Sequence, residues 1–361
     1  RFEELLLTVQ KPGRYSGGEV NSVVKDKNKV DVRFAFCFPD TYEVGMSHLG
    51  MKILYSQFNE REDIWCERVF APWIDFEKVM LENNIELFGL ESRDAIKDFD
   101  FIGFTLQYEL SYTNVLNMLE LAGIPYVGCR VLASAVCMDK AVANALFDAA
   151  GIPHTKWLSA CRWEIESDLD GVCDGAIAKL GWPIFVKPAN AGSSVGITKA
   201  HDRDELKQAI ALALENDHKV VFEAFVDGHE VECAVIGSDP AVATRPGEIL
   251  AGAEFYTYDD KYKNGVSQVV IPARLSEEKL DEVKTYAAMA YTALNCEGLA
   301  RCDFFVEHGT DRVMINEINT FPGFTPISMY PKLMEHEGTP VPALIDRLIE
   351  LALERTQKQH G

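Results

Sequence analysis

The segments LNCEGLARCDFF at residues 294–305 and VMINEINTFPG at residues 313–323 decide the fold and the chemistry expected of this chain. We predict strands at Ala300–Val306 and Val313–Glu317 because apolar residues fill most positions of both segments. Few polar residues interrupt these apolar runs. Successive side chains alternate along a strand, so the face to which each polar side chain points can be worked out from the spacing.

These polar residues suit a metal site. Asp303, Glu317 and Asn319 offer oxygen ligands, which hard Mg²⁺ or Mn²⁺ prefers. If the two strands are neighbours, Glu317 and Asn319 share one face, where Asp303 can join them and two metal ions could bridge the β- and γ-phosphates of a nucleotide. Arg301 lies two residues from Asp303 and points to the same site. The alternative is a solvated acidic strand edge, which the following TFPG turn and a lysine loop upstream disfavour.

The segment KPANAGSSVG at residues 187–196 is that lysine loop. Its two glycines allow backbone N–H groups to approach a phosphate, Ser193 and Ser194 add hydroxyl donors, and Lys187 supplies a positive charge. No G-K-[ST] sequence occurs, so the segment is not a Walker loop. The alternative interpretation is a flexible surface turn.

Strands and helices alternate through the rest of the C-terminal two thirds. A capping box is expected at Asp202 and Glu205, at the start of a helix. Strands at Val220–Val226 and Glu230–Ile236 are expected to form a pair around a turn at Asp227-Gly228. The other predicted elements are helices at Met138–Ala150, Ser276–Leu294 and Pro342–Arg355, and a strand at Trp182–Lys187.

The sequence pattern of the first third of the chain predicts an α/β layer. Strands alternating with helices indicate a parallel sheet. No G-x-G-x-x-G follows any of the strands, so no dinucleotide site is expected. The predicted strands are Val30–Phe38, Ile85–Leu90 and Phe101–Leu106, and the predicted helices are Gly45–Asn59, Phe76–Asn84 and Tyr108–Ala122.

Composition bounds the class of protein. The 361 residues are 47% apolar, which predicts two or three domains with a large core. With 35 basic and 56 acidic residues the net charge is −21, which argues against a nucleic-acid partner. The sequence contains no run of about 18 uncharged apolar residues, so no membrane span is expected. The first residues show no basic-then-apolar signal layout, and we expect a cytoplasmic protein.

The nine cysteines predict reduced thiols. Their number is odd, and nothing marks the chain as secreted. No C-x-x-C pair is present, and no cysteine cluster has the spacing of an iron–sulfur centre. We therefore expect neither a zinc site nor an iron–sulfur site.

From about Leu119 to Arg355 the sequence resembles the D-alanine–D-alanine ligases of the ATP-grasp superfamily. The resemblance rests on LELAGIPYVG at residues 119–128, on Met138-Asp-Lys140, and on a C-terminal signature. It implies an α/β (α+β) fold class, in which ATP-grasp central and C-terminal domains (126–220 and 221–361) follow a parallel-sheet α/β domain (1–125). The signature residues are Leu294, Gly298, Ala300, Arg301, Asp303, Ile315, Glu317, Asn319, Pro322 and Gly323.

The resemblance implies a set of ATP contacts. Lys140 and Lys187 would hold the α- and β-phosphates, and the loop of Ser193 and Ser194 would close over them. Lys261 would lie on a mobile loop that covers the phosphates. The remaining contacts would be made to the adenine by Glu223, Phe225 and Val226 and to the ribose by Glu230, unless the two glutamates are ordinary strand-edge carboxylates.

The resemblance also implies substrate contacts. Tyr262 would contact Ser193 near the first substrate, and Ser328 would hold the carboxylate of the second. Arg301 and the backbone N–H of Gly323 would stabilise the oxyanion. The loop FYTYDDKY at residues 255–262 favours D-alanine over D-lactate as acceptor and leaves D-serine open. In sum, the implied catalytic residues are Ser193, Arg301 and Ser328, the substrate residues are Tyr262, Gly323, Ser328 and Met329, and the ligands of two Mg²⁺ or Mn²⁺ ions are Asp303, Glu317 and Asn319.

Residues 1 to about 118 resemble instead the front segment of radical-SAM proteins with a cobalamin-binding-like N-terminal domain. The resembling segments are QKPGRY at 10–15, FCFPDTYEVGMSHLG at 36–50 and GFTLQYELSY at 103–112. The radical-SAM cysteine cluster and the cobalamin D-x-H-x-x-G pattern are absent, so His48 is expected to be a packed or surface histidine. The glutamate and the H-G-x-x-G-E-D-G stretch with which the ligases orient the first D-alanine are also absent. We expect this front domain to supply no catalytic acid or base.

The leading prediction is an ATP-dependent ligase that joins two D-alanines through an acyl phosphate for peptidoglycan synthesis. Two alternatives stay open. One is a nucleotide-binding protein that does not ligate, which the missing N-terminal motif supports. The other is an ATP-grasp ligase for another substrate, such as D-serine. The expected partner is D-alanine, with no nucleic acid and no membrane, and a homodimer is one assembly that the resemblance allows.

Overall fold

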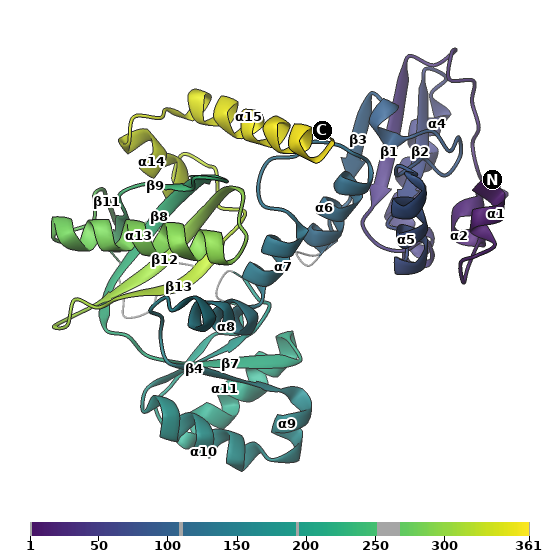
Figure 1. Ribbon diagram of the computed structural model, residues 1–361. Helices are drawn as coiled ribbons and strands as arrows, with labels where there is room; N and C mark the ends of the chain where they lie inside the picture. Colours follow the sequence, from purple (N-terminus) through teal and green to yellow (C-terminus); the bar gives the residue numbers. More distant parts are fainter. Residues whose placement is uncertain (1, 108–110, 193–194, 251–267, 361) are drawn as a thin grey trace. The chain divides into compact units, whose positions relative to one another are not determined.

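The computed structural model describes residues 2–107, 111–192, 195–250 and 268–360, and the chain divides into two compact units (Figure 1). The N-terminal unit comprises residues 1–126 and 353–361, and the C-terminal unit comprises residues 127–352. None of the helices in the described ranges combines the length and the apolar character needed to cross a bilayer.

The N-terminal unit is built on a parallel sheet, as the alternation of strands and helices predicts. Its strand order is β2-β1-β3, with β1 at Val32–Phe38, β2 at Ile64–Phe70 and β3 at Phe101–Phe104. β1 lies in the centre and pairs with both neighbours. The helices of this unit are α1 (Phe2–Leu6), α2 (Gly13–Ser16), α3 (Tyr42–Ser47), α4 (Leu49–Glu60), α5 (Ile74–Asn83), η1 (Ile96–Asp98) and α6 (Tyr112–Leu121).

The sequence pattern does not reveal β2, because two charged residues interrupt it. Glu67 is fully buried, and its Oε1 accepts a hydrogen bond from Arg33 at 2.7 Å. Arg68 is 5% exposed, and its Nε donates to Oε1 of Glu91 at 2.6 Å. Each buried charge has a partner of opposite sign, so this strand can carry charged residues into the interior.

The strand predicted at Ile85–Leu90 is wrong. The segment forms one isolated bridge and no ladder. The backbone N–H groups of Leu87, Gly89 and Leu90 donate to carbonyls in three different segments. No single neighbouring strand can therefore pair with it, although its side chains at 87 and 90 are buried as apolar residues should be.

The helix predicted at Gly45–Asn59 is interrupted at His48. This residue has an extended backbone, with φ −77° and ψ 113°, and it separates α3 from α4. Its Nδ1 accepts a hydrogen bond from the N–H of Met51 at 3.1 Å, which caps the N-terminus of α4. His48 thus has a structural role in the described structure, in agreement with the expectation that it is a packed or surface histidine.

The C-terminal unit contains two antiparallel sheets (Figure 1). The four-stranded sheet has the order β4-β7-β5-β6, with β4 at Trp157–Cys161, β5 at Ile184–Pro188, β6 at Thr198–Ala200 and β7 at Lys219–Ala224. The six-stranded sheet has the order β11-β10-β8-β12-β13, with β9 paired to β8. Its strands are β8 (Gly228–Gly237), β9 (Val242–Ala243), β10 (Gly247–Leu250), β11 (Gln268–Val270), β12 (Gly298–Glu307) and β13 (Val313–Asn319).

Helices cover one face of the four-stranded sheet and both faces of the six-stranded sheet. Helices α10 and α11 pack on the four-stranded sheet, α13 packs on one face of the six-stranded sheet, and α14 with the first turns of α15 packs on its other face. The helices of this unit are α7 (Val131–Met138), α8 (Lys140–Ala150), α9 (Arg162–Ser167), α10 (Leu169–Leu180), α11 (Arg203–Asn216), α13 (Glu277–Ala293), α14 (Met329–His336) and α15 (Val341–His360), whose last residues group with the N-terminal unit.

The expected pairing of the two strands around Asp227-Gly228 is wrong. β7 lies between β4 and β5, so both of its edges are occupied within the four-stranded sheet. β8 lies between β10 and β12 in the other sheet. The segment between β7 and β8 therefore connects the two sheets and is not a hairpin turn.

The helix start at Asp202 differs from the expected capping box in one hydrogen bond. The Oδ1 of Asp202 accepts from the N–H groups of Asp204 and Glu205, as an N-cap should. The carboxylate of Glu205, however, accepts from the N–H of His201 and not from that of Asp202. The helix is capped, but the reciprocal bond expected of a capping box is made one residue earlier.

A β-bulge decides which side chains of β13 face the core. Asp303 pairs with Glu317, but the next pair along the two strands joins Phe304 to Ile315, so Asn316 has no partner in the register. The alternation shifts by one residue at this point. The isoleucines on both sides of the bulge are consequently buried under α13, while Glu317 stays on the opposite face.

A buried carboxylate should make the C-terminal unit sensitive to acid. Glu248 of β10 is 2% exposed and accepts bonds from Nε and Nη2 of Arg274 and from His229. Its bond to Arg274 lowers the pKa of Glu248 from 4.5 to about 2. A depressed pKa stabilises the folded state above the unfolded pKa, and this contribution is lost as the pH falls from about 4.5 to about 2. Because Arg274 is more than half exposed, we expect a loss of only about 2 kcal/mol.

Urea unfolding of wild type and Glu248→Gln over this pH range tests the expectation. The neutral amide has no such dependence, so the difference between the two proteins should shrink as the pH falls. Equal pH dependence in both proteins would show that Glu248 is not the responsible group.

Candidate active site

Predicted site residues gather on one face of the six-stranded sheet. In the antiparallel register of β12 and β13, Asp303 is opposite Glu317, and Arg301 is opposite Asn319. On the other side of β12, Asp303 is opposite Glu232 of β8. The register therefore brings the residues predicted as metal ligands together with the arginine predicted at the oxyanion. Their roles remain predictions.

Arg301 forms a two-pronged ion pair at the centre of this face. Its Nε and Nη2 donate to the two carboxylate oxygens of Asp303, both at 2.7 Å. Its Nε also lies 3.1 Å from Oε2 of Glu232. Burial acts to lower the pKa of Arg301, but the charges of Asp303 and Glu232 outweigh it and raise that pKa. The side chain is 19% exposed, so a permanently charged guanidinium remains accessible to a ligand.

The same face carries the three residues predicted as metal ligands. In the described ranges no three His, Cys, Asp or Glu side chains form a metal-binding group. The predicted set has only two carboxylates, Asp303 and Glu317, together with the amide of Asn319. The Oδ1 of Asn319 accepts a hydrogen bond from the backbone N–H of Phe321 at 3.1 Å, and this bond restrains the orientation of the side-chain amide. These oxygen donors fit Mg²⁺ or Mn²⁺, with phosphate and water oxygens completing the coordination.

Lys140 joins this face to the lysine loop. It is the first residue of α8, whose N-terminus is capped by the carboxylate of Asp139. The Nζ of Lys140 donates to the carbonyl oxygen of Ala191 at 2.7 Å and lies 4.0 Å from Oε2 of Glu317. A phosphate held by Lys140 would consequently lie beside a predicted metal ligand.

Lys187 of β5 and Glu223 of β7 form a buried ion pair. Their Nζ and Oε2 are 2.5 Å apart, and Nδ2 of Asn144 lies 3.3 Å from the other oxygen of Glu223. Burial acts to lower the pKa of Lys187, but the charge of Glu223 outweighs it and raises that pKa. Lys187 is thus held in the charged form that a phosphate needs, and a nucleotide would compete with Glu223 for it.

The connection between the two sheets carries the residues predicted to contact adenine and ribose. The ring of Phe225 is 39% exposed and lies 6.1 Å from that of Phe185. The Nζ of Lys199 is 4.0 Å from the centre of the Phe225 ring. Val226 is half-buried, and Glu230 follows near the start of β8 with an exposed side chain. An exposed aromatic ring is a surface on which a planar base can lie.

Gly323 and Ser328 come together before α14. The Oγ of Ser328 accepts from the N–H of Thr325 at 3.0 Å and lies 2.9 Å from the hydroxyl of Thr325. A Cβ atom on Gly323 would lie 2.8 Å from Oγ of Ser328, so glycine is needed for this close approach. The side chain of Met329 is buried in the apolar core, so its predicted substrate contact would be made through its backbone.

Replacing Gly323 with alanine should displace Ser328. Because the new methyl group would overlap Oγ, we expect the KM for D-alanine, the predicted substrate, to rise by about 10-fold or more, while the affinity for ATP, the predicted nucleotide, stays within about twofold. Phosphate release measured against D-alanine concentration at saturating ATP provides the readout. Gly175→Ala is the matched control, since a Cβ there meets nothing within 4 Å. Equal loss of both affinities would point to general unfolding and contradict the assignment.

Four predicted site residues lie outside the described residues: Ser193, Ser194, Lys261 and Tyr262. Their roles stay predictions. Two residues that do lie at the site were not predicted, namely Glu232 and Asn144. The alternation of Glu230, Glu232 and Ala234 along β8 is a signal that could have revealed Glu232, but nothing in the sequence marks Asn144.

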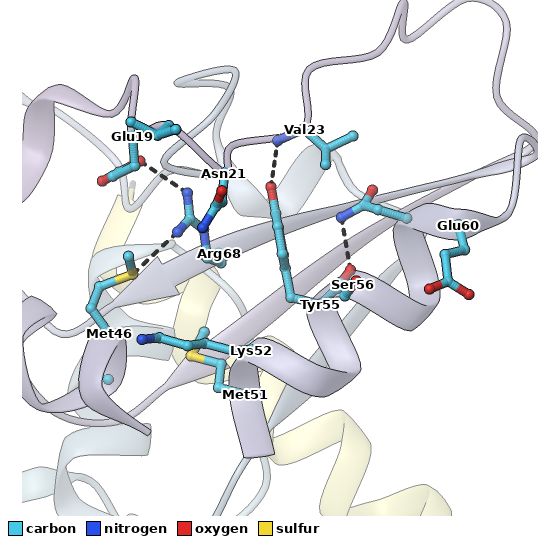
Figure 2. Close-up of a pocket in the computed structure, with 13 residues that line it drawn as sticks. Glu19, Asn21, Val23, Met46, Met51, Lys52, Tyr55, Ser56, Glu60 and Arg68 are labelled. Carbon is cyan, nitrogen blue, oxygen red and sulfur yellow. Dashed lines mark hydrogen bonds and ion pairs between the residues drawn. The ribbon is translucent and has the colours of Figure 1, made fainter. Parts of the chain in front are cut away.

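A separate cavity of about 440 Å³ lies in the N-terminal unit (Figure 2). Arg68 forms part of its wall and is held by Glu19, by Met46 and, beneath the surface, by Glu91. Tyr55 closes one side and donates to Glu91 at 3.0 Å. None of the residues predicted to act in catalysis lines this cavity, so we place the candidate active site in the C-terminal unit.

Comparison with known proteins agrees with this placement. A family model described as D-ala D-ala ligase C-terminus matches residues 146–350, which is more than half of the chain. The chain belongs to the D-alanine–D-alanine ligase family. A second family model, described as Radical SAM proteins, N-terminal, matches residues 50–130. Both resemblances seen in the sequence are therefore confirmed.

Individual members of the ligase family support the assignment. The D-alanine–D-alanine ligase of Acetivibrio thermocellus is 54% identical over 241 residues, which cover 67% of this chain and 64% of the relative. That of Caldicellulosiruptor bescii is 48% identical over 245 residues, with coverages of 68% and 67%. This chain thus spans about two thirds of the length of the curated ligases that it matches.

Solved structures of the family share the fold. The D-alanine-D-alanine ligase from Coxiella burnetii has a TM-score of 0.64 at 27% identity and covers 91% of this chain and 96% of its own. The VanG D-Ala:D-Ser ligase from Enterococcus faecalis has the same TM-score at 30% identity, with coverages of 89% and 99%. The expected α/β fold class with an ATP-grasp core is confirmed.

Proposed function

We propose that this chain binds ATP between its two antiparallel sheets and uses it to join two D-alanine molecules. The observation that carries the proposal is the placement of Lys140, whose Nζ lies 4.0 Å from Glu317 and contacts the lysine loop. It links a predicted phosphate site on one sheet to a predicted metal site on the other. The names of the 45–54% identical relatives support D-alanine as the substrate.

Different residues of the chain would act at the different steps of this reaction. Lys140 and Lys187 would offset the charge of the ATP phosphates, so that the carboxylate of the first D-alanine can attack the γ-phosphate and form an acyl phosphate. Mg²⁺ or Mn²⁺ held by Asp303, Glu317 and Asn319 would further neutralise the phosphates. The amine of the second D-alanine then attacks the acyl carbon, and phosphate leaves.

Arg301 and the Gly323–Ser328 segment would act at that second step. Arg301 carries a fixed positive charge on an accessible guanidinium, which suits the oxyanion that develops on the acyl oxygen. Ser328 offers a hydroxyl, and the backbone N–H of Gly323 offers a second donor. Both groups lie in the segment that follows β13 and Asn319. A homodimer and a cytoplasmic location belong to the same proposal.

The division of the C-terminal unit at residue 220 is also part of the proposal. It is supported by β7 and β8, which follow one another in the chain but belong to different sheets. ATP would then lie between a central domain that ends near β7 and a catalytic domain that begins near β8.

The experiment is an assay of the purified chain with ATP, Mg²⁺ and D-alanine, in which phosphate and dipeptide are both quantified. The Acetivibrio thermocellus relative assayed in parallel is the benchmark. The N-terminal unit lacks the family's glutamate and H-G-x-x-G-E-D-G stretch, so we expect ATP affinity near the benchmark but ligation slower by orders of magnitude. ATP binding without any D-alanine-dependent phosphate release would favour a nucleotide-binding protein that does not ligate.

D-Serine as the second substrate is the alternative that a specific finding favours. The VanG D-Ala:D-Ser ligase matches the fold with a TM-score of 0.64. Adding D-alanine and D-serine together to the same assay separates the two cases. A mixed D-alanyl-D-serine product in excess over the dialanine product would replace the second substrate in the proposal and leave the ATP site unchanged.

A further inference from the structure

Three thiols meet in the core of the C-terminal unit. The Sγ of Cys137, in the last turn of α7, lies 3.8 Å from the Sγ of Cys296, in the turn between α13 and β12. Cys129 is the third, and its Sγ lies 3.2 Å from the carbonyl oxygen of Glu297. Nothing in the proposed ligase reaction uses these groups.

The three thiols differ in access to solvent. Cys296 is 4% exposed and Cys129 is 0% exposed, whereas Cys137 is only half-buried. Hydrogen bonding to Cys296 and burial raise the pKa of Cys129, so that thiol stays protonated. A dissolved oxidant would consequently meet Cys137 first, with Cys296 directly behind it.

We propose that Cys137 and Cys296 are a modification site at which hydrogen peroxide forms an intramolecular disulfide. The Cys137 thiolate attacks one peroxide oxygen, so that an S–O bond forms, the O–O bond breaks and hydroxide leaves as water after taking up a proton. The Cys296 sulfur then attacks the sulfenic sulfur, so that an S–S bond forms, the S–O bond breaks and a second water leaves with the thiol proton. Two thiols are oxidised by two electrons, and one peroxide is reduced.

The geometry needs little rearrangement. A disulfide requires its sulfurs to be about 2.05 Å apart, so the observed 3.8 Å must shorten by less than 2 Å. A change of side-chain rotamer can supply such a shift. The bond would join segments distant in sequence, because the two cysteines are 159 residues apart.

The position gives the modification a consequence. Cys137 lies three residues before Lys140, and Cys296 lies five residues before Arg301. A covalent link between them would fix the start of α8 relative to β12. It would thus restrain the two elements that carry a predicted phosphate ligand and the predicted oxyanion ligand. The chemistry of the thiols does not depend on the proposed ligase activity.

The test is peptide mapping after treatment with hydrogen peroxide and blocking of the remaining thiols. Trypsin should release residues 131–140 with Cys137 as their only cysteine, residues 285–301 with Cys296, and residues 98–130 with Cys129. We expect a cross-linked pair of the first two peptides, lighter than their sum by two hydrogen atoms and separated again by dithiothreitol. Its appearance only between two isotopically distinct copies of the chain, or a link from Cys137 to Cys129, would overturn the proposal.

Single variants sharpen the result. Cys296→Ala should stop the reaction at the sulfenic acid of Cys137, which dimedone traps, and Cys137→Ala should leave Cys296 reduced. Cys161→Ala is the matched control, because Cys161 is partly exposed in the four-stranded sheet, away from the three thiols, and the cross-link should persist there. If Cys137 stays a free thiol in wild type while Cys161 is oxidised, the site is not peroxide-reactive and the proposal fails.

Discussion

Replacing Arg301 with alanine is expected to reduce D-alanine-dependent phosphate release by about 10²–10³-fold, the usual cost of losing one oxyanion donor. The structural reason is that Arg301 holds the carboxylate of Asp303 with two hydrogen bonds of 2.7 Å and keeps its charge at this face of the sheet. Its removal would also take away the cation that now pairs with both Asp303 and Glu232, which are opposite one another on β12 and β8. We therefore expect a loss of unfolding free energy of about 3 kcal/mol.

Arg301→Lys separates the two effects. Lysine keeps the positive charge between Asp303 and Glu232, and should recover most of the stability. It cannot reproduce the planar fork, so the rate should recover only in part. Steady-state kinetics and urea unfolding of the three proteins provide the measurements. Full activity in the alanine variant would remove Arg301 from the proposed oxyanion site.

Replacing Lys187 with alanine is expected to weaken ATP binding by about 1.5–3 kcal/mol, or roughly 10–150-fold, which is the scale of a charge-assisted hydrogen bond. Lys187 is buried on the four-stranded sheet and fully charged beside Glu223. A nucleotide phosphate at this position would lose its cation and would meet an uncompensated carboxylate. Calorimetric titration with Mg–ATP gives the affinity directly.

Two further variants interpret that result. Lys207→Ala removes a lysine of α11 that pairs with Asp170 and has no predicted role in ATP binding. This variant should bind ATP as tightly as wild type does. Lys187→Ala combined with Glu223→Gln removes the leftover negative charge. If the double variant binds ATP as tightly as wild type, the loss of ATP affinity in Lys187→Ala came from the unneutralised charge of Glu223, and Lys187 is not a phosphate ligand.

The sequence predicts elements best where their side chains follow a simple period. The strands that carry Arg301, Asp303 and Glu317 were predicted because they are apolar between their polar positions, and β12 and β13 lie as expected. β2 was not predicted, because Glu67 and Arg68 break its apolar pattern. Those two charges are acceptable in the core only because Arg33 and Glu91 reach them from distant segments, and single-sequence periodicity contains no record of such partners.

The same limit applies to the candidate site. The ligands of one hairpin, Asp303 and Glu317, are predictable from strand alternation alone. The ion pair between Lys187 and Glu223 is not, because their pairing requires β5 and β7 to be neighbours in a sheet whose strand order is not the chain order. The role of His48 as a helix cap involves only neighbouring residues. Even so, it can be recognised only once α3 and α4 are known to be separate helices.

The extra residue at position 316 makes β13 tolerant of both substitution and deletion at that point. Any residue that accepts the bulge geometry can replace Asn316, since it has no partner in the register. Deleting it would join Ile315 directly to Glu317, and ordinary alternation would then keep Ile315 and Ile318 under α13 and Glu317 opposite Asp303. Deleting Ile318 instead would bring Asn319 to a core position and turn a predicted metal ligand away from its site. The bulge thus lets this strand lose one residue without reversing the side chains that face the predicted ligands.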